Sequence, residues 1–161
     1  DRIVQLSTGR VLVPAADHGD ISKRPNSPAV CYISDDEGKT WRRGRGEVRL
    51  GGIGCQEPGL VELKDGRVYM IIRNSLGTIY RAISTDGGLT WGEAASTGLK
   101  SPVAPSTITR IPSTGDLLMV WYIAVIAPLN LGLGYMIARY LDMGRRQTAN
   151  TADESLKTEE V

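Results

Sequence analysis

Phenylalanine is absent from this 161-residue sequence, histidine occurs once, and cysteine occurs only twice. Two cysteines are too few for a disulfide framework, and Cys31 and Cys55 lack metal-ligand spacing, so no metal or cofactor is expected. An excess of charge is also lacking, because 19 basic and 18 acidic residues leave a formal net charge of +1. A nucleic-acid partner is therefore not expected. Cys31 is predicted to be a buried strand residue, whereas the place of Cys55, in a Gly-rich loop, stays open.

Glycine and proline are plentiful, with 19 and 8 residues, and this composition suits a turn-rich all-β protein. The sequence also repeats itself. The segment Ser34–Trp41 recurs as Ser84–Trp91, displaced by 50 residues. A repeat period near fifty residues is typical of propellers and solenoids. The shared positions are Ser34, Asp36, Gly38, Thr40 and Trp41 in the first copy, and Ser84, Asp86, Gly88, Thr90 and Trp91 in the second.

A second repeated pattern predicts β-hairpins. At residues 3–12, 60–69 and 108–117 an alternating strand meets a polar turn with Gly, and a second apolar strand follows. A third strand is expected at 29–33 and at 78–83, and a fourth can follow each tryptophan. Four short antiparallel strands in about fifty residues make one propeller blade. The prediction is an all-β propeller fragment of about two and a half blades, at residues 1–50, 51–98 and 99–122.

The repeated Ser-x-Asp-x-Gly-x-Thr-Trp segment is predicted to hold a turn. Its Asp can accept hydrogen bonds from nearby backbone N–H groups, its Gly supplies a positive φ, and its Trp offers an apolar face for packing between sheets. A catalytic or calcium-binding pair of Asp36 and Asp86 is the alternative, but ligand spacing of the EF-hand kind is missing. The structural interpretation is favoured.

This segment resembles the Asp box of sialidases and related bacterial-neuraminidase-repeat proteins, and the resemblance covers roughly residues 1–122. It implies a six-bladed β-propeller with exo-sialidase activity. Non-catalytic propellers carry the same turn, so the boxes alone do not specify an enzyme. The resemblance also implies a secreted or periplasmic protein, although nothing in the sequence itself reports localisation.

A sharper match lies between the boxes, at residues 56–73, where sialidases have a Glu that opens one strand and an Arg that ends the next. With the turn at residues 64–66, Glu57 and Arg73 are expected to lie together at the open end of the hairpin. The resemblance implies that Arg73 holds the carboxylate of sialic acid and that Glu57 takes the proton of a tyrosine nucleophile. A surface ion pair without function is the alternative.

The loop after residue 16 is about seven residues longer than its counterpart in the second repeat, because the hairpins are 57 apart and the boxes 50 apart. Extra length in one connection often marks a binding loop. His18 and Asp20 are therefore candidates for the sugar pocket, with solvation as the alternative. Glu62 is expected to be an outward strand residue, and Arg110 is expected to be structural although Arg110-Ile111-Pro112 has the letters of a sialidase motif.

After Trp121 neither a third strand nor a third box is expected. Residues 117–138 contain no charged residue, which makes them a candidate membrane span, but residues 117–122 already belong to a predicted strand. Pro128, Asn130 and glycines interrupt the remainder, so a membrane partner is not favoured. Residues 123–161 are predicted to be a tail outside the propeller, hydrophobic and then disordered, with a helix as one option.

The leading functional prediction is an exo-α-sialidase-type glycoside hydrolase module that cleaves terminal sialic acid with retention, and its partner is a sialylated glycan or another acidic sugar. The chain is expected to be incomplete and inactive alone, because two and a half blades leave sheet faces open. The alternative is a non-catalytic carbohydrate-binding or scaffold propeller. A membrane-anchored propeller remnant is a third hypothesis.

Overall fold

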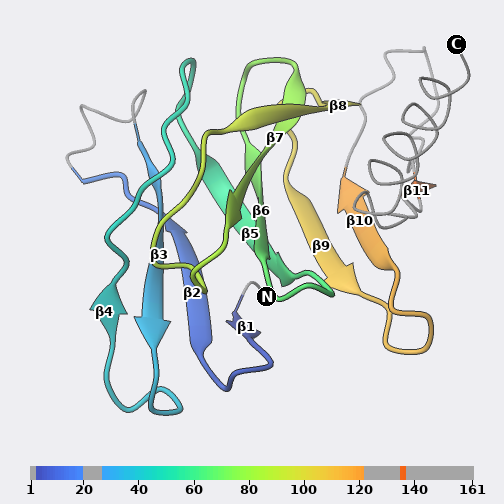
Figure 1. Ribbon diagram of the computed structural model, residues 1–161. Coiled ribbons are helices and arrows are strands. Elements are labelled where there is room, and N and C mark those ends of the chain that lie inside the picture. Colours follow the sequence, from blue (N-terminus) through green and yellow to red (C-terminus); the bar gives the residue numbers. More distant parts are fainter. Residues whose placement is uncertain (1–2, 20–26, 122–134, 137–161) are drawn as a thin grey trace, which may run out of the picture.

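Three antiparallel β-sheets follow one another in space in the order of the chain (Figure 1). The computed structural model describes residues 3–19, 27–121 and 135–136. Blade 1 has strands in the order β1 (Val4–Gln5), β2 (Val11–Ala16), β3 (Ala29–Ser34) and β4 (Arg42–Arg43). Blade 2 has β5 (Gln56–Glu62), β6 (Val68–Arg73), β7 (Thr78–Ser84) and β8 (Ala95–Lys100). Blade 3 has the order β11 (Tyr135–Met136), β10 (Leu117–Trp121) and β9 (Ser106–Arg110).

These sheets confirm the predicted all-β fold with four-stranded antiparallel blades. Each predicted hairpin forms with its Gly in the turn, since Gly9, Gly66 and Gly115 all have positive φ. One boundary differs slightly, because β8 pairs with β7 as far as Lys100, beyond the boundary predicted at residue 98.

The core lies between the faces of successive blades. Side chains alternate along each strand, so the two faces of a sheet carry different side chains, and blade 2 has one face toward blade 1 and the other toward blade 3. Between blades 1 and 2, the buried cluster contains Leu12, Cys31 and Ile33 from blade 1 and Leu60, Val68, Met70, Ile72 and Ala82 from blade 2. Between blades 2 and 3, it contains Val61, Tyr69, Ile71, Ile79, Leu117, Met119 and Trp121. Every fully buried aliphatic side chain here contributes about 1.5–3 kcal/mol.

The third blade corrects one expectation about the tail. Tyr135–Met136 pairs antiparallel with β10, with Met119 opposite Met136 and Val120 opposite Tyr135. The prediction that no third strand follows Trp121 is therefore wrong at this point; sequence pattern missed β11 because only two residues pair. The uncharged segment 117–138 begins as strand β10, and residues 122–134 and 137–161, including the predicted tail, otherwise lie outside the described residues. Among the described residues, no helix is long and apolar enough to cross a membrane.

Both cysteines are buried thiols. Cys31 has no exposed surface, as predicted, and burial raises the pKa of its thiol to about 12 despite a hydrogen bond from the backbone of Val13. Cys55, whose place the sequence left open, is also fully buried, and burial raises its pKa. A thiol with a raised pKa is a poor nucleophile, so both cysteines act as core residues.

The two Asp boxes have the same internal hydrogen bonds. The Thr40 backbone N–H and hydroxyl donate to the Asp36 carboxylate at 2.8 and 2.6 Å, and the Gly38 N–H donates to the Ser34 hydroxyl at 2.8 Å. Thr90 donates to Asp86 at 2.9 and 2.6 Å, and Gly88 donates to Ser84 at 2.8 Å. Each carboxylate therefore closes its own turn. The repeated Ser, Thr and Gly positions all take part in this network.

These hydrogen bonds stabilise the charged form of both carboxylates. Donation from the Thr40 side chain, then from the Thr40 backbone and Ser34, lowers the pKa of Asp36 from 3.8 to about 2. Burial alone would raise the pKa of Asp86, but the bonds from Thr90 and Ser84 outweigh it and the pKa is lowered. Asp36 and Asp86 are thus engaged inside their turns.

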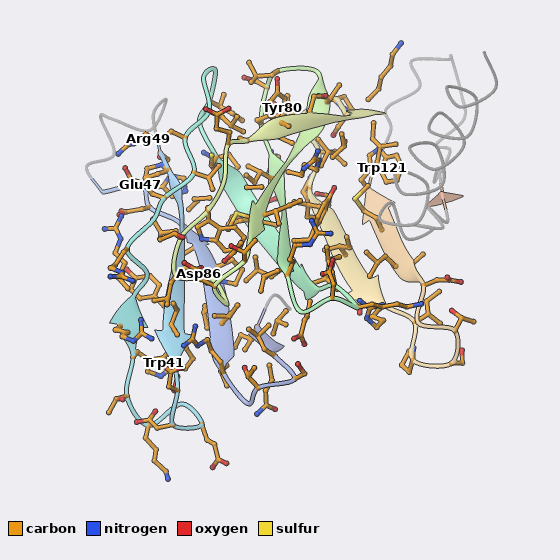
Figure 2. All side chains as sticks on the ribbon, in the orientation of Figure 1. Trp41, Glu47, Arg49, Tyr80, Asp86 and Trp121 are labelled. Carbon is orange, nitrogen blue, oxygen red and sulfur yellow. The ribbon has the colours of Figure 1, made fainter. Side chains whose placement is uncertain are left out.

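The tryptophans of the two boxes differ. Trp91 is half-buried and packs against the core between blades 1 and 2. Trp41 is 45% exposed and lies at the margin of the molecule in Figure 2, and its indole N–H donates to the Gly38 carbonyl at 2.9 Å. The prediction of a tryptophan packed between sheets is therefore wrong for Trp41, because no other described sheet covers the first box.

Candidate functional site

Glu57 lies at the start of β5 in an unusual backbone conformation. Pairing of β5 with β6 shifts register between Gln56 and Gly59, which marks a β-bulge, and Glu57 has a φ of +43°. A non-Gly residue in this left-handed region costs about 1–3 kcal/mol, and such conformations cluster at functional sites. Bulges also re-aim a side chain next to active sites. The backbone thus directs the Glu57 side chain differently from its neighbours on the strand.

Arg73 ends β6 and meets Glu57, as the hairpin geometry predicts. Arg73 Nη1 lies 3.0 Å from Glu57 Oε1, and the register places Gln56 opposite Arg73. The Arg73 side chain is 26% exposed and the Glu57 side chain 42% exposed. Among the described residues, the buried Nε of Arg73 has no hydrogen-bond acceptor. A partly exposed ion pair contributes only about 0–1 kcal/mol, so stability alone does not account for the strained backbone beside it.

A cavity of about 410 Å³ lies beside Glu57, and the long loop of blade 1 forms part of its lining. It is lined by Pro14, Ala15, Ala16, His18, Gln56, Glu57 and Pro58. His18 is fixed by a 2.9 Å hydrogen bond between its Nδ1 and the hydroxyl of Ser27, whose side chain is buried. The Ser27 carbonyl accepts from the Cys55 N–H at 2.8 Å, which ties the loop to the chain just before Glu57. His18 and Glu57 therefore share one cavity.

Sequence reasoning found part of this arrangement. Glu57, Arg73 and His18 come together, whereas Asp20 lies outside the described residues. Gln56 and Ser27 were missed. Gln56 could have been found from the hairpin register, since it is paired with Arg73; nothing in the sequence indicates that Ser27 reaches His18.

Glu62, predicted to be an outward strand residue, and Arg110, predicted to be structural, both make contacts between blades. The Glu62 carboxylate accepts from the backbone N–H and the hydroxyl of Ser7 at 2.8 and 2.7 Å. The Arg110 guanidinium donates to the carbonyls of Glu62 and Gly115. Both residues hold neighbouring blades together. Within the described part of the chain, no three His, Cys, Asp or Glu side chains gather in a way that could hold a metal ion.

The fold defines a β-propeller module of the sialidase type. Residues 1–124 match the model of the BNR repeat-like domain, and the chain belongs to this family.

Three similar proteins differ in how much of this chain they match. A sialidase from Micromonospora viridifaciens is 41% identical over 85 residues, which is 51% of this chain but only 12% of that protein. A Dyadobacter fermentans protein of unknown function has a structure with a TM-score of 0.61 and 26% identity, over 74% of this chain and 32% of that one. The Trypanosoma rangeli sialidase in complex with sialic acid has a TM-score of 0.56 and 22% identity, over 71% of this chain and 19% of that one. The chain therefore spans a small part of the length of these proteins.

Proposed function

We propose that this module contributes Glu57 and Arg73 to the substrate site of an exo-α-sialidase, which removes terminal sialic acid from glycoconjugates with retention. The observation that carries the proposal is the 3.0 Å pair of Arg73 and Glu57 beside a cavity, with Glu57 in a left-handed backbone conformation. The 41% identity with a sialidase and the structural likeness to a sialidase that binds sialic acid support it.

Each residue has a distinct role in this proposal. Arg73 binds the carboxylate of the sugar, because a planar guanidinium matches a carboxylate with two hydrogen bonds. A carboxylate nucleophile would be repelled by the substrate carboxylate, so the nucleophile is a neutral tyrosine, and Glu57 takes its proton. His18 and Asp20 contribute to the pocket for the rest of the sugar. The proposal concerns the blades formed by residues 1–122.

The first test is binding of sialic acid to the chain, followed by the saturation transferred from protein to sugar in NMR. Arg73→Lys is expected to reduce binding about tenfold or more, because Lys cannot form the bidentate contact. Arg67→Lys is the matched control, since Arg67 pairs with Asp65 at the far end of the same hairpin. Equal losses in both variants, or no binding to the unchanged chain, would contradict the role of Arg73.

The second test asks whether Glu57 takes part in the hydrolysis or only contributes negative charge to the site. Glu57→Gln removes a negative charge near the bound carboxylate, so binding of sialic acid is expected to be unchanged or tighter, whereas hydrolysis of a fluorogenic sialoside by an assembled enzyme is lost. Glu62→Gln, on the same strand, is the control with hydrolysis retained. The alternative, a non-catalytic carbohydrate-binding or scaffold propeller, predicts binding without hydrolysis in every assembly that contains the chain.

A further inference from the structure

Two apolar side chains are exposed at the end of blade 2 that carries Glu57 and Arg73. Leu76, in the connection from β6 to β7, is 43% exposed, and Val103, in the connection from β8 to β9, is 37% exposed. Strands β5, β7 and β9 begin at this end and β6 and β8 finish there, so both connections lie at the same end as the candidate site (Figure 1). We call Leu76 and Val103 the apolar rim of blade 2.

The backbone of Val103 is in an unfavourable conformation. Its φ is +53°, and a β-branched side chain crowds the backbone in this left-handed region. Pro102 precedes it, and in turns where proline is followed by a residue of positive φ, that residue is usually glycine. The valine side chain therefore stands where the fold alone favours glycine. Such strained residues cluster at ligand sites.

The two connections of the apolar rim are held by hydrogen bonds. Asn74 is 2% exposed, and its side-chain carbonyl accepts from the Leu76 N–H at 2.6 Å while its amide donates to two strand carbonyls. The Gly77 carbonyl accepts from the Ser101 N–H at 3.0 Å, which joins the second connection to the first. The backbone thus presents both apolar side chains in a preformed arrangement, and a ligand that covers them pays little for ordering them.

A series of hydrogen bonds also joins the apolar rim to the candidate site. Gln56, which is opposite Arg73 in the register of the hairpin, donates from its side-chain amide to the Ile53 carbonyl at 3.0 Å. The Ile53 N–H donates to the hydroxyl of Ser75 at 3.1 Å, and Ser75 directly precedes Leu76. The apolar rim is therefore adjacent to the end of β6 where Arg73 lies.

The cavity and the connection that carries Val103 lie toward different neighbours of blade 2. The cavity is lined by the end of β2 and the start of β5, which face each other between blades 1 and 2. Val103 belongs to the connection that leads into blade 3. In a sialoside, the carboxylate and the glycosidic oxygen are bonded to the same anomeric carbon. With the carboxylate on Arg73 and the sugar ring at the cavity, the aglycone can extend over the apolar rim.

We propose that the apolar rim binds an apolar aglycone, aromatic or alkyl, of the sialoside whose carboxylate Arg73 holds. This inference rests on the function proposed for Arg73 and adds the class of substrate. None of residues 51–55, 74–77 and 101–105, which form the three connections at this end, is charged. A charged aglycone would find no partner among them, whereas an apolar aglycone removes the exposed surface of both rim side chains from water.

The test compares two α-sialosides that differ only in the aglycone, methyl and 4-methylumbelliferyl. Dissociation constants for the whole chain are measured by saturation transfer in NMR, and the umbelliferyl sialoside is expected to bind about tenfold more tightly. Val103→Gly and Leu76→Ser should each reduce this preference to about threefold and together abolish it, while the methyl sialoside, which does not reach the apolar rim, binds as before. Because glycine tolerates the positive φ, the denaturation midpoint of Val103→Gly should not fall, which separates a lost contact from a lost fold.

Trp41→Ser is the matched control, because Trp41 is 45% exposed but lies beyond the far end of β3, away from the candidate site. This variant should keep the tenfold preference. Loss of the preference in Trp41→Ser with retention in the rim variants would show unspecific apolar contact and overturn the inference. Equal affinity of the unchanged chain for both sialosides would overturn it as well, although the role of Arg73 would stand. If neither sialoside bound, the proposed function and this inference would both be refuted.

Discussion

Blades 1 and 2 have the same sequence pattern and the same turn, but they differ in what surrounds that turn. Asp36 and Asp86 accept hydrogen bonds of 2.8 and 2.9 Å from the equivalent backbone N–H groups, although Trp41 is 45% exposed and Trp91 is half-buried. The Asp box therefore determines its own local conformation, and the neighbouring sheet determines how much packing is added. The local hydrogen bonds and the packing between blades can be separated experimentally.

The largest expected effect concerns equivalent core positions of the two blades. Met70 has no exposed surface and lies between blades 1 and 2, whereas Val13, at the equivalent position of the first hairpin, is half-buried on the face of blade 1 that points away from blade 2. Met70→Ala is expected to cost about 2–5 kcal/mol of unfolding free energy because it leaves a cavity. Val13→Ala removes fewer atoms from a site that is open to solvent, so about 1 kcal/mol or less is expected. Urea denaturation followed by far-UV circular dichroism measures both costs. Equal costs would mean that Val13 is packed as tightly as Met70.

Substitution of the glycine in each Asp box is expected to give a smaller difference in stability between the two blades. Gly38 and Gly88 have φ of +87° and +85°, so Ala is strained at both. A Cβ on Gly88 would also lie 3.0 Å from Leu12 Cδ1, whereas on Gly38 it would make an ordinary 3.6 Å contact with Trp41. Gly38→Ala is expected to cost about 1–2 kcal/mol for strain alone, and Gly88→Ala about 1–3 kcal/mol more for overpacking. If the two variants had the same denaturation midpoint, the Leu12 side chain of blade 1 would move at no cost to make room for the added methyl group.

Sequence pattern predicted most of the fold because its signals are local. The hairpin glycines, the alternation of apolar residues and the repeated boxes placed the strands of blades 1 and 2 to within a few residues. The short strand β11 was not predicted, since only two of its residues pair with β10. The exposure of Trp41 was not predicted either, because burial of a box depends on a different sheet.

The candidate site was also predictable only in part. The meeting of Glu57 with Arg73 follows from hairpin register and was predictable. The φ of +43° at Glu57 was not, because Glu is no signal for a left-handed residue and the bulge depends on the pairing with β6. The contact of Ser27 with His18 depends on how both ends of a long loop are held, and spacing alone does not report it.

The loss of stability at low pH tests whether the two Asp boxes are equally stable as local structures. The pKa of Asp36 is lowered to about 2 and that of Asp86 is lowered as well, so both carboxylates bind fewer protons in the folded than in the unfolded chain. Their stabilisation is fully present above an unfolded pKa of about 4 and is lost as pH falls toward the folded pKa. Thermal melting between pH 5 and pH 2 is expected to show this loss, and Asp36→Asn and Asp86→Asn should each flatten the decline. An unchanged acid slope in both variants would mean that other carboxylates, such as Asp35, dominate.

The smallest expected effect is a gain in stability at the uncovered box. Glu37 has a φ of +60°, and its equivalent Gly87 has +67°, so blade 1 holds a strained residue where blade 2 has a glycine. Glu37→Gly should stabilise the chain by about 0.5–1 kcal/mol, because relief of the left-handed strain exceeds the greater entropy of glycine in the unfolded state. The reverse change, Gly87→Glu, is expected to destabilise, since a Cβ there would lie 2.8 Å from Arg10 Nη1. Differential scanning calorimetry of both variants measures the asymmetry. If Glu37→Gly lowered the melting temperature, the Glu37 carboxylate would have a stabilising partner within the natural chain, and the first box would be less isolated than its exposure implies.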